Sequence, residues 1–436
     1  MSGPQGQGTR TPAPRPDSAV PAVPDVFDPR LYGRGLPHDA FRTLRAHHPV
    51  AWQEEYEVLG WPAGPGFWAL TRHADVVRVL KDAGTFSSWL GATQIRDPDP
   101  ADLPFIRRMM LNQDPAPGAT EESGPGHGRL RRLVSRAFTP ARVDRFTAAA
   151  RARARELLGA ARERGPVVDL VSAVTDDYAL LNLADLLGVP ESDRGLLLGW
   201  TERVIAYQDP DEPPLLDDRG RPVNPRSPAM LREMFDYAQE LAEYKRRVPA
   251  DDVMTSLAAS ALTDAELEMF FFLLTVAGND TVRSAAPGGL LALAEHPDEQ
   301  RRLREGDIPL GTAVDELLRW HPPVLSFRRT AARDTVVHGS RIRAGDKVVV
   351  FHAAANYDER AFRDPYRLDL SRRPNPHVSF GDGPHICLGA HFARLQLRVL
   401  HDEVRETLPP MTLAQPPRHL VSNFINGIKS LRVRLG

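Results

Sequence analysis

The stretch Phe380-Gly381-Asp382-Gly383-Pro384-His385-Ile386-Cys387-Leu388-Gly389 decides the fold, because it places the one cysteine of the chain where a glycine-rich loop enters a helix. Beyond it, apolar residues recur at spacings of four, three and four, which predicts a helix that starts just after Cys387 and stops before Pro409-Pro410. At the positive end of a helix we expect a thiol to have a lowered pKa and to favour the thiolate. Gly383 and Gly389 would let the backbone approach a flat, bulky group that a β-carbon would obstruct.

A single cysteine excludes several kinds of site. No internal disulfide can form, and neither a zinc finger nor an iron–sulfur cluster held by several cysteines is possible. A lone cysteine is most often a small buried hydrophobic residue. The loop and helix around Cys387 favour another interpretation, because a single thiolate with loop N–H groups directed at it suits the axial ligand of a haem iron.

The spacing Phe-x-x-Gly-x-x-x-Cys-x-Gly, filled by Phe380, Gly383, Cys387 and Gly389, resembles the haem-binding loop of the cytochrome P450 family. Two further motifs stand in the family's order, so the resemblance covers about residues 28–436. It implies a mainly α fold with a smaller β region, built as a single domain with a long central helix over haem b. It also implies that Cys387 binds the iron.

The second motif is Glu316-Leu317-Leu318-Arg319, whose carboxylate and guanidinium share a helix face. By itself such a pair is most often a surface ion pair worth about 0.3–0.5 kcal/mol. The resemblance implies a buried, structural pair that holds a segment before the cysteine loop, with Arg363 or Arg367 as the third partner.

The third motif is Ala277-Gly278-Asn279-Asp280-Thr281, inside the long helix. Glycine, asparagine and aspartate weaken a helix interior, so a tolerated defect is one interpretation. The resemblance implies a groove for dioxygen, in which Gly278 leaves room, Thr281 donates a hydrogen bond and Asp280 relays protons. We also expect Pro287 to kink this helix.

A haem brings two carboxylates that need cationic partners. The resemblance assigns these contacts to His127, Arg131, Arg328 and His385, with Arg329 as a rival of Arg328; solvated charges are the alternative. The remaining residues expected to touch the cofactor are Ala277, Gly278, Phe380, Gly383 and Gly389. Residues 116–126 look like an insertion before His127.

The resemblance places apolar segments over the haem, which suggests an apolar substrate, although core packing predicts the same composition. The substrate-contacting residues expected from these segments are Trp89, Leu90, Met109, Ile205, Val324, Phe327 and Phe424. Residues 66–71, 86–88 and 110–114 are similar to soluble bacterial members that hydroxylate steroids, terpenoids and branched lipids.

Composition limits the remaining function classes. The chain has 436 residues, 42% of them hydrophobic, and a formal net charge of −2, which argues against a nucleic-acid binder. Residues 1–27 predict a disordered tail and 28–436 one domain. We see no signal peptide and no membrane-spanning stretch, and we expect a cytoplasmic protein. Residues 112–128 and 208–228 predict mobile loops.

Local patterns predict further elements. Residues 67–71 predict a strand and 73–81 a helix, and residues 335–350 predict a hairpin with strands 335–337 and 347–350. Thr263 and Glu266 predict a capping box at the start of the long helix, which should run to Glu295. A further helix is predicted from Thr312 to Pro322.

The expected function is a haem-dependent monooxygenase that hydroxylates a C–H bond of a largely apolar small molecule. Electrons from NAD(P)H would arrive through a ferredoxin reductase and a ferredoxin, for which Arg129, Arg132 and Arg136 form a candidate positive patch. Two alternatives stay open. One is oxidative C–C or C–N coupling in peptide or indole biosynthesis, and the other is a haem protein that binds a ligand without turnover.

Overall fold

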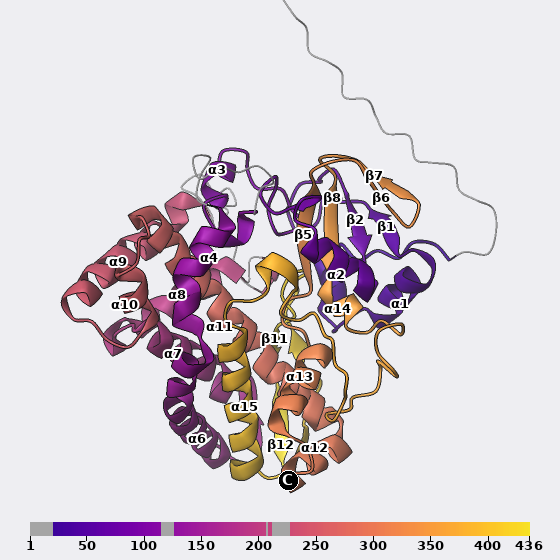
Figure 1. Ribbon diagram of the computed structural model, residues 1–436. Helices are drawn as coiled ribbons and strands as arrows, with labels where there is room; N and C mark the ends of the chain where they lie inside the picture. The colour runs from indigo at the N-terminus through magenta and orange to yellow at the C-terminus, as the bar shows by residue number, and fades with distance from the viewer. Residues whose placement is uncertain (1–20, 115–125, 206–207, 212–226) are drawn as a thin grey trace, which may run out of the picture.

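The computed structural model describes residues 21–114, 126–205, 208–211 and 227–436, with only the backbone for residues 202–205. Most of this chain is helical, and a smaller strand-rich region lies to one side (Figure 1). The helices are α1 His38–His47, α2 His73–Lys81, α3 Leu103–Ile106, α4 His127–Ser135, α5 Pro140–Val143, α6 Thr147–Glu163, α7 Asp176–Leu187, α8 Arg194–Ile205, α9 Pro228–Arg247, α10 Val253–Ala258, α11 Asp264–Glu295, α12 Pro297–Glu305, α13 Leu310–Trp320, α14 His352–Ala355 and α15 Ala390–Thr407.

Four sheets accompany the helices in the described ranges. The largest has the order β1-β2-β8-β5-β3, and β2 and β8 pair in parallel within it. The strands are β1 Val50–Gln53, β2 Phe67–Leu70, β3 Phe86–Ser87, β4 Val167–Asp169, β5 Ser326–Ala331, β6 Thr335–Val337, β7 Ser340–Ile342, β8 Lys347–Phe351, β9 Met411–Leu413, β10 Arg418–His419, β11 Ile428–Ser430 and β12 Arg432–Leu435.

Helix α11 is the centre of the helical region, in contact with α7, α8, α9, α13 and α15. Its start confirms the predicted capping box: Thr263 N–H donates to the Glu266 carboxylate at 2.9 Å, and Glu266 N–H donates to Thr263 Oγ1 at 3.3 Å. The helix continues through Pro287 to Glu295. Just beyond this proline, Gly288 and Gly289 leave space for the rings of His321 and His401, which a β-carbon would strike.

Three predicted boundaries were wrong. Helix α13 begins at Leu310 rather than Thr312, because Pro309 starts the first turn and the Thr312 hydroxyl instead accepts a hydrogen bond from Arg373. The hairpin pairs β6 with β7, while residues 347–351 form β8 in the main sheet. Helix α15 begins at Ala390, three residues beyond the cysteine.

The predicted tail also ends earlier than expected. Residues 1–20 lie outside the described part, but Val26 and Phe27 are buried in a core cluster with Phe41 and Phe67. The globular part of the chain therefore begins before Asp28. None of the helices in the described ranges is both long enough and apolar enough to cross a bilayer.

The two predicted loops are described only at their ends. Residues 115–125, 206–207 and 212–226 lie outside the described part. Asp114 is buried, and it accepts hydrogen bonds from Ser88 N–H at 2.8 Å and Trp89 N–H at 3.2 Å. Asp209 is also buried and forms an ion pair with Lys429 at 2.8 Å. These described ends are therefore anchored to the domain.

Candidate functional site

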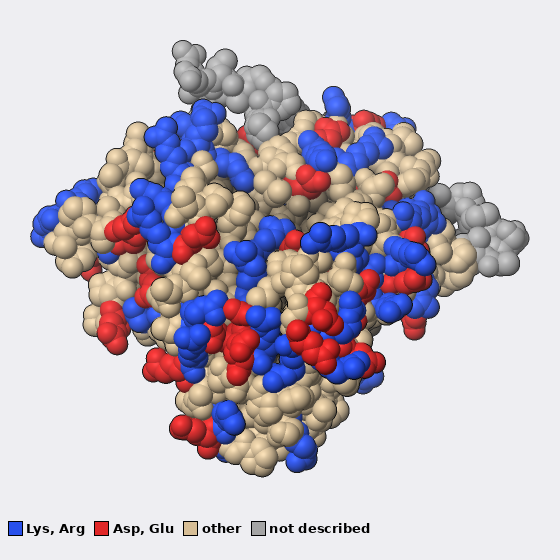
Figure 2. Space-filling model, turned by 60° about the horizontal axis from the view of Figure 1, so that its bottom comes forward, with Lys and Arg blue, Asp and Glu red and all other residues tan. Residues whose placement is uncertain are grey.

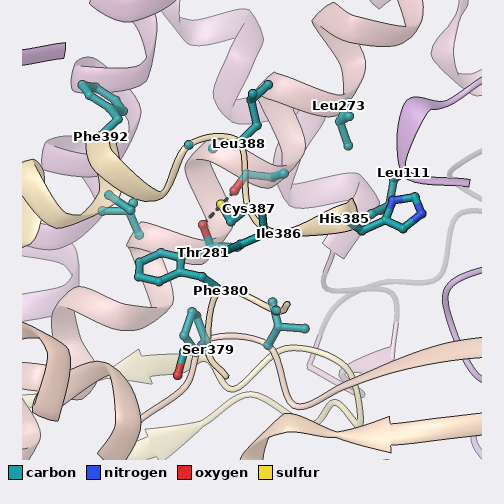
Figure 3. Close-up of a pocket in the computed structure, with 18 of the residues that line it drawn as sticks. Leu111, Leu273, Thr281, Ser379, Phe380, His385, Ile386, Cys387, Leu388 and Phe392 are labelled. Atoms are coloured by element: carbon teal, nitrogen blue, oxygen red, sulfur yellow. Dashed lines mark hydrogen bonds between the residues drawn. The ribbon is translucent and has the colours of Figure 1, made fainter. Parts of the chain in front are cut away.

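A largely apolar cavity of about 220 Å³ lies between α11, the loop before α15, and the edge formed by α4 and β5. Figure 3 shows Cys387 on its loop and Thr281 of α11 among the lining residues. The apolar part of the lining includes Leu273, Leu274, Val282, Val324, Phe327, Leu388 and Phe392. The cavity is thus formed by segments that lie far apart in the sequence.

Cys387 presents its sulfur to this cavity. Its backbone N–H donates to Phe380 O at 2.8 Å, which closes the loop on itself. Burial raises the pKa of the thiol, and the Gly389 N–H, Arg131 and Arg394 only partly offset that effect. The predicted lowering of this pKa was therefore wrong for the protein alone, because α15 starts too late for its dipole to outweigh the apolar surroundings.

The two glycines of the motif, Gly383 and Gly389, have different structural roles. Gly383 has φ +68°, and a β-carbon there would lie 2.4 Å from Leu80 O, so this glycine lets the loop lie against the end of α2. Gly389 lines the cavity and has open space at its β-carbon position. Only Gly389 therefore leaves space toward the cavity.

The Glu316–Arg319 pair is fully buried, with nitrogen–oxygen distances of 2.7 and 2.8 Å. Its third partner is Arg372, whose Nε lies 3.0 Å from both Glu316 oxygens. The prediction of Arg363 or Arg367 was wrong, because these two residues offer only their carbonyl oxygens, to the Arg372 guanidinium.

The motif in α11 brings one of its three polar side chains, that of Thr281, to the cavity. Thr281 lines it and donates from Oγ1 to Ala277 O at 2.7 Å. Asp280 is buried and is not part of the lining. Ala277 and Gly278 line the cavity, and a β-carbon on Gly278 would lie 2.7 Å from the Leu183 side chain. Gly278 therefore also permits the close packing of α11 on α7.

One end of the cavity is basic. His127 and Arg131 of α4 and His385 of the loop all line it, and the two histidine rings lie 4.3 Å apart. The buried Nε2 of His127 has no hydrogen-bond partner among the described residues. Burial, then His385 and Arg131, lower the pKa of His127 to about 4. Asp114 lies 3.8 Å from His385 Nε2.

Neighbouring arginines of β5 point in opposite directions, as alternation along a strand requires. Arg329 lines the cavity, whereas Arg328 forms an ion pair with Asp97 at 2.6 Å. The structure thus gives the cavity position to the rival, Arg329, and corrects the choice of Arg328. Within the described residues Arg329 has no ion pair, and burial lowers its pKa to about 10.

The predicted substrate contacts divide into two groups. Val324 and Phe327 line the cavity, and Phe424 lies behind them with its ring centre 5.5 Å from that of Phe327. Trp89 and Leu90 are 43% and 45% exposed and, like Met109, lie outside the lining. The side chain of Ile205 lies outside the described residues.

The prediction missed several polar residues of the lining, Ser379, Asp382, His352 and Gln396. His352 is the lone polar side chain in the apolar stretch 348–355, whereas Gln396 lies between Arg394 and Arg398 in α15. A buried polar group in an apolar stretch is therefore a signal that could have identified His352, but not Gln396.

Comparison with known proteins gives matches to one family. A family model described as Cytochrome P450 matches residues 307–404. A steroid C26-monooxygenase of Mycobacterium tuberculosis is 35% identical over 97% of this chain and 95% of its own length. A methyl-branched lipid omega-hydroxylase of that organism is 37% identical over 90% of each chain. A solved cytochrome P450 of Mycobacterium marinum, in complex with pseudoionone, is 37% identical with a TM-score of 0.81, and covers 97% of this chain and 99% of its own.

The mainly helical fold, the cavity lined by Cys387 and these relatives together define a class of haem-binding oxidoreductases. The chain belongs to the cytochrome P450 family, and it is an oxidoreductase of the monooxygenase type.

Proposed function

We propose that this monooxygenase hydroxylates a C–H bond of a largely apolar small molecule, with Cys387 as the iron ligand. The observation that carries the proposal is that the Cys387 sulfur and the Thr281 hydroxyl line one apolar cavity. A thiolate-bound haem supplies the chemistry that splits dioxygen. The residues of this chain supply the sulfur, the shape of the cavity and the protons.

The cavity lining suits a haem. The Cys387 sulfur and the space at Gly389 lie on one wall, where the face of a flat group could approach. At the basic end, Arg329 has no ion pair and His127 Nε2 no partner among the described residues. Buried cations and donors without partners require an anionic ligand. We therefore assign the two haem carboxylates to His127, Arg131, Arg329 and His385.

Thr281 is the group that would move a proton inside the cavity. Its hydroxyl donates to Ala277 O, which holds Oγ1 in position at the cavity wall. Passing a proton from Oγ1 requires a replacement, and Asp280, the next residue along the buried helix, is the proposed source.

The substrate class is inferred from the lining and from the relatives. The wall formed by Leu273, Leu274, Val324 and Phe327 offers no charged group to a ligand, so an apolar molecule fits it. The named relatives act on a steroid and on a methyl-branched lipid. We propose a substrate of this branched, apolar kind.

Electrons would come from NAD(P)H through a ferredoxin reductase and a ferredoxin. On the face shown in Figure 2, basic and acidic side chains are interspersed, so docking would depend on a local patch. Arg132 lies in helix α4 and Arg136 directly follows it, and both residues are exposed without an ion pair among the described residues. Arg129 is instead paired with Glu266. The candidate patch therefore reduces mainly to Arg132 and Arg136.

The test is spectroscopic. Reduced, carbon-monoxide-treated protein should show the red-shifted absorption of a thiolate-bound haem, and Cys387→Ala should lose it. The ferric protein should then be titrated with steroids, branched fatty acids and indoles, because a substrate that displaces the axial water shifts the haem spectrum. Thr281→Ala should bind the same substrates but divert NADPH-derived electrons to peroxide, and Thr281→Ser should restore coupling. Product formation by Thr281→Ala with unchanged coupling would refute the role of Thr281.

A further inference from the structure

Gln208 is a buried polar residue that joins two segments far apart in the sequence. It lies shortly after α8, is 6% exposed, and donates from Nε2 to Asn423 Oδ1 at 3.1 Å. Its Oε1 accepts from Ser422 Oγ at 3.0 Å and from Asn423 N–H at 3.2 Å. These three hydrogen bonds connect the end of α8 to residues 422–425, which lie close to the C-terminus.

The orientation of both side-chain amides follows from one group that can only accept. Asn423 Nδ2 donates at 2.6 Å to the carbonyl oxygen of Phe27. Asn423 Oδ1 therefore faces Gln208 Nε2, and Gln208 Oε1 faces the donors of Ser422 and Asn423. Replacing Gln208 with alanine would leave these buried groups without their partner, which is costly.

The hydroxyl of Ser422 extends this connection to the backbone of Phe424. Its oxygen accepts from Phe424 N–H and from Ile425 N–H, both at 3.1 Å. Because the hydroxyl hydrogen is donated to Gln208, the oxygen acts as the acceptor for both N–H groups. Gln208 thus fixes the hydroxyl of Ser422 and, through it, the position of Phe424.

Phe424 and Ile425 lie directly behind the wall of the cavity. Phe424 O accepts from Leu325 N–H at 2.8 Å, and Ile425 forms a β-bridge with Val324. The ring centres of Phe424 and Phe327 lie 5.5 Å apart. Since Val324 and Phe327 line the cavity, a shift of Phe424 and Ile425 would move the wall that a substrate meets.

We propose that Gln208 is a positioning residue that sets the substrate preference of the cavity by holding residues 422–425 against its wall. Gln208 itself is not part of the lining, so it acts through Ser422 and Phe424. A preformed wall favours a bulky, rigid ligand, because such a ligand does not have to order the wall when it binds. The inference rests on the proposed function, since it concerns the preference of the same apolar cavity.

The segment around Gln208 has a second attachment that does not depend on the glutamine. Asp209 accepts from Val421 N–H at 2.9 Å and forms an ion pair with Lys429 at 2.8 Å. A change at Gln208 alone should therefore loosen residues 422–425 without detaching the segment that follows α8.

The experiment uses the haem-loaded full chain with Gln208→Ala, Ser422→Ala, the double variant and Gln300→Ala as the matched control. Gln300 is also 6% exposed and also makes three hydrogen bonds among the described residues. Its Nε2 donates to Leu293 O and Met411 O at 2.9 Å, and its Oε1 accepts from Met411 N–H at 2.8 Å. It is not part of the cavity lining, so its loss should affect stability but not the wall.

Two measurements follow these variants. Amide hydrogen exchange, read by mass spectrometry, reports how firmly residues 421–426 are held and needs no ligand. Spectral titration of the haem with imidazole and with clotrimazole reports the wall. Both compounds bind the iron through an azole nitrogen, but clotrimazole also carries bulky rings that must fit against the cavity wall.

Gln208→Ala and Ser422→Ala should each speed exchange in residues 421–426 and weaken clotrimazole binding about fivefold, with imidazole affinity unchanged. The double variant should bind clotrimazole no more weakly than either single variant, because both changes interrupt one chain of hydrogen bonds. Unchanged exchange, a ratio of the two affinities that stays the same or moves the other way, or an equal change in Gln300→Ala overturns the inference. A wild-type haem spectrum that does not respond to imidazole would instead refute the proposed function.

Discussion

Two buried groups of charges in this protein differ in whether the fold satisfies them. In the first, Glu316 receives Arg319 and Arg372, and the guanidinium donors that remain go to backbone carbonyls. In the second, Arg329 has no ion pair and His352 no hydrogen-bond partner within the described residues. The first group is complete without a ligand, whereas the second is complete only with one.

This difference distinguishes residues that stabilise the fold from residues that bind a ligand. The complete group connects α13 to residues 363–372, which lead to the cysteine loop, so its loss should unfold this region whether or not a ligand is present. The incomplete group carries desolvated donors that the protein alone cannot use. Its removal should weaken the loaded protein but not the empty one.

The largest effect is expected from Glu316→Gln. This change leaves two arginines buried without their anion, and we expect a loss of about 3–5 kcal/mol in the free energy of unfolding. Urea unfolding, followed by circular dichroism, measures it. A loss below about 1 kcal/mol would show that Arg319 and Arg372 do not depend on the charge of Glu316.

The control for this change is a pair of the same spacing on the surface. Asp298 lies 3.0 Å from Arg301, and its side chain is 90% exposed. Asp298→Asn should change the free energy of unfolding by no more than about 0.5 kcal/mol, because water screens such a pair.

Arg329→Met should change the free energy of unfolding in opposite directions in the apoprotein and the holoprotein. Without haem, removal of an unpaired buried cation should stabilise the protein by about 1–3 kcal/mol. With haem, the loss of a carboxylate partner should destabilise it by a similar amount. Unfolding of the apoprotein and holoprotein by urea measures both, and a destabilised apoprotein would contradict the comparison.

The sequence predicted the residues of the cavity and of the Glu316 group unevenly. Cys387, Thr281, His127, Arg131 and His385 meet at the cavity as expected, because motif spacing defines which residues share a loop or a helix face. The same applies to the Glu316–Arg319 pair and to the capping box of α11.

The predictions that failed concerned the direction of side chains along a strand or residues in irregular backbone. Adjacent residues of a strand face opposite sides, and nothing local says whether Arg328 or Arg329 faces inward. Arg372 comes from an irregular segment without periodicity, so no pattern distinguished it from Arg363 and Arg367. Trp89 is apolar yet exposed, because the hydrogen bonds to buried Asp114 fix its backbone at the surface.

A smaller effect, on the pH dependence of stability, is expected from a buried histidine that belongs to neither group. The pKa of His401 is lowered to about 4 by burial, against about 6.5 when unfolded. Between these values the unfolded state binds the extra proton, so stability is full above about pH 6.5 and falls as the pH drops toward 4. Between pH 7.5 and pH 5, His401→Leu should lose about 2 kcal/mol less than the wild type in urea unfolding. Equal losses would show that His401 does not titrate with folding.

The smallest effect is expected at Asp97, which pairs with two nearly buried cations but is itself partly exposed to water. Its carboxylate lies 2.6 Å from Arg328 and 2.7 Å from Lys347, both nearly buried, but its own side chain is 47% exposed. Burial opposes its ionisation, yet the two cations outweigh burial and lower the pKa of Asp97. Lys347 also keeps Glu55 at 2.6 Å, so Asp97→Asn leaves only Arg328 without an anion, and next to water.

We therefore expect Asp97→Asn to lower the free energy of unfolding by about 1 kcal/mol, and by less at high salt, because water and ions reach this carboxylate. Urea unfolding at low and high salt measures both values. A loss as large as that of Glu316→Gln would mean that exposure of one partner does not relieve a buried cation. The distinction between complete and incomplete groups would then depend on the number of partners alone, and not on their access to solvent.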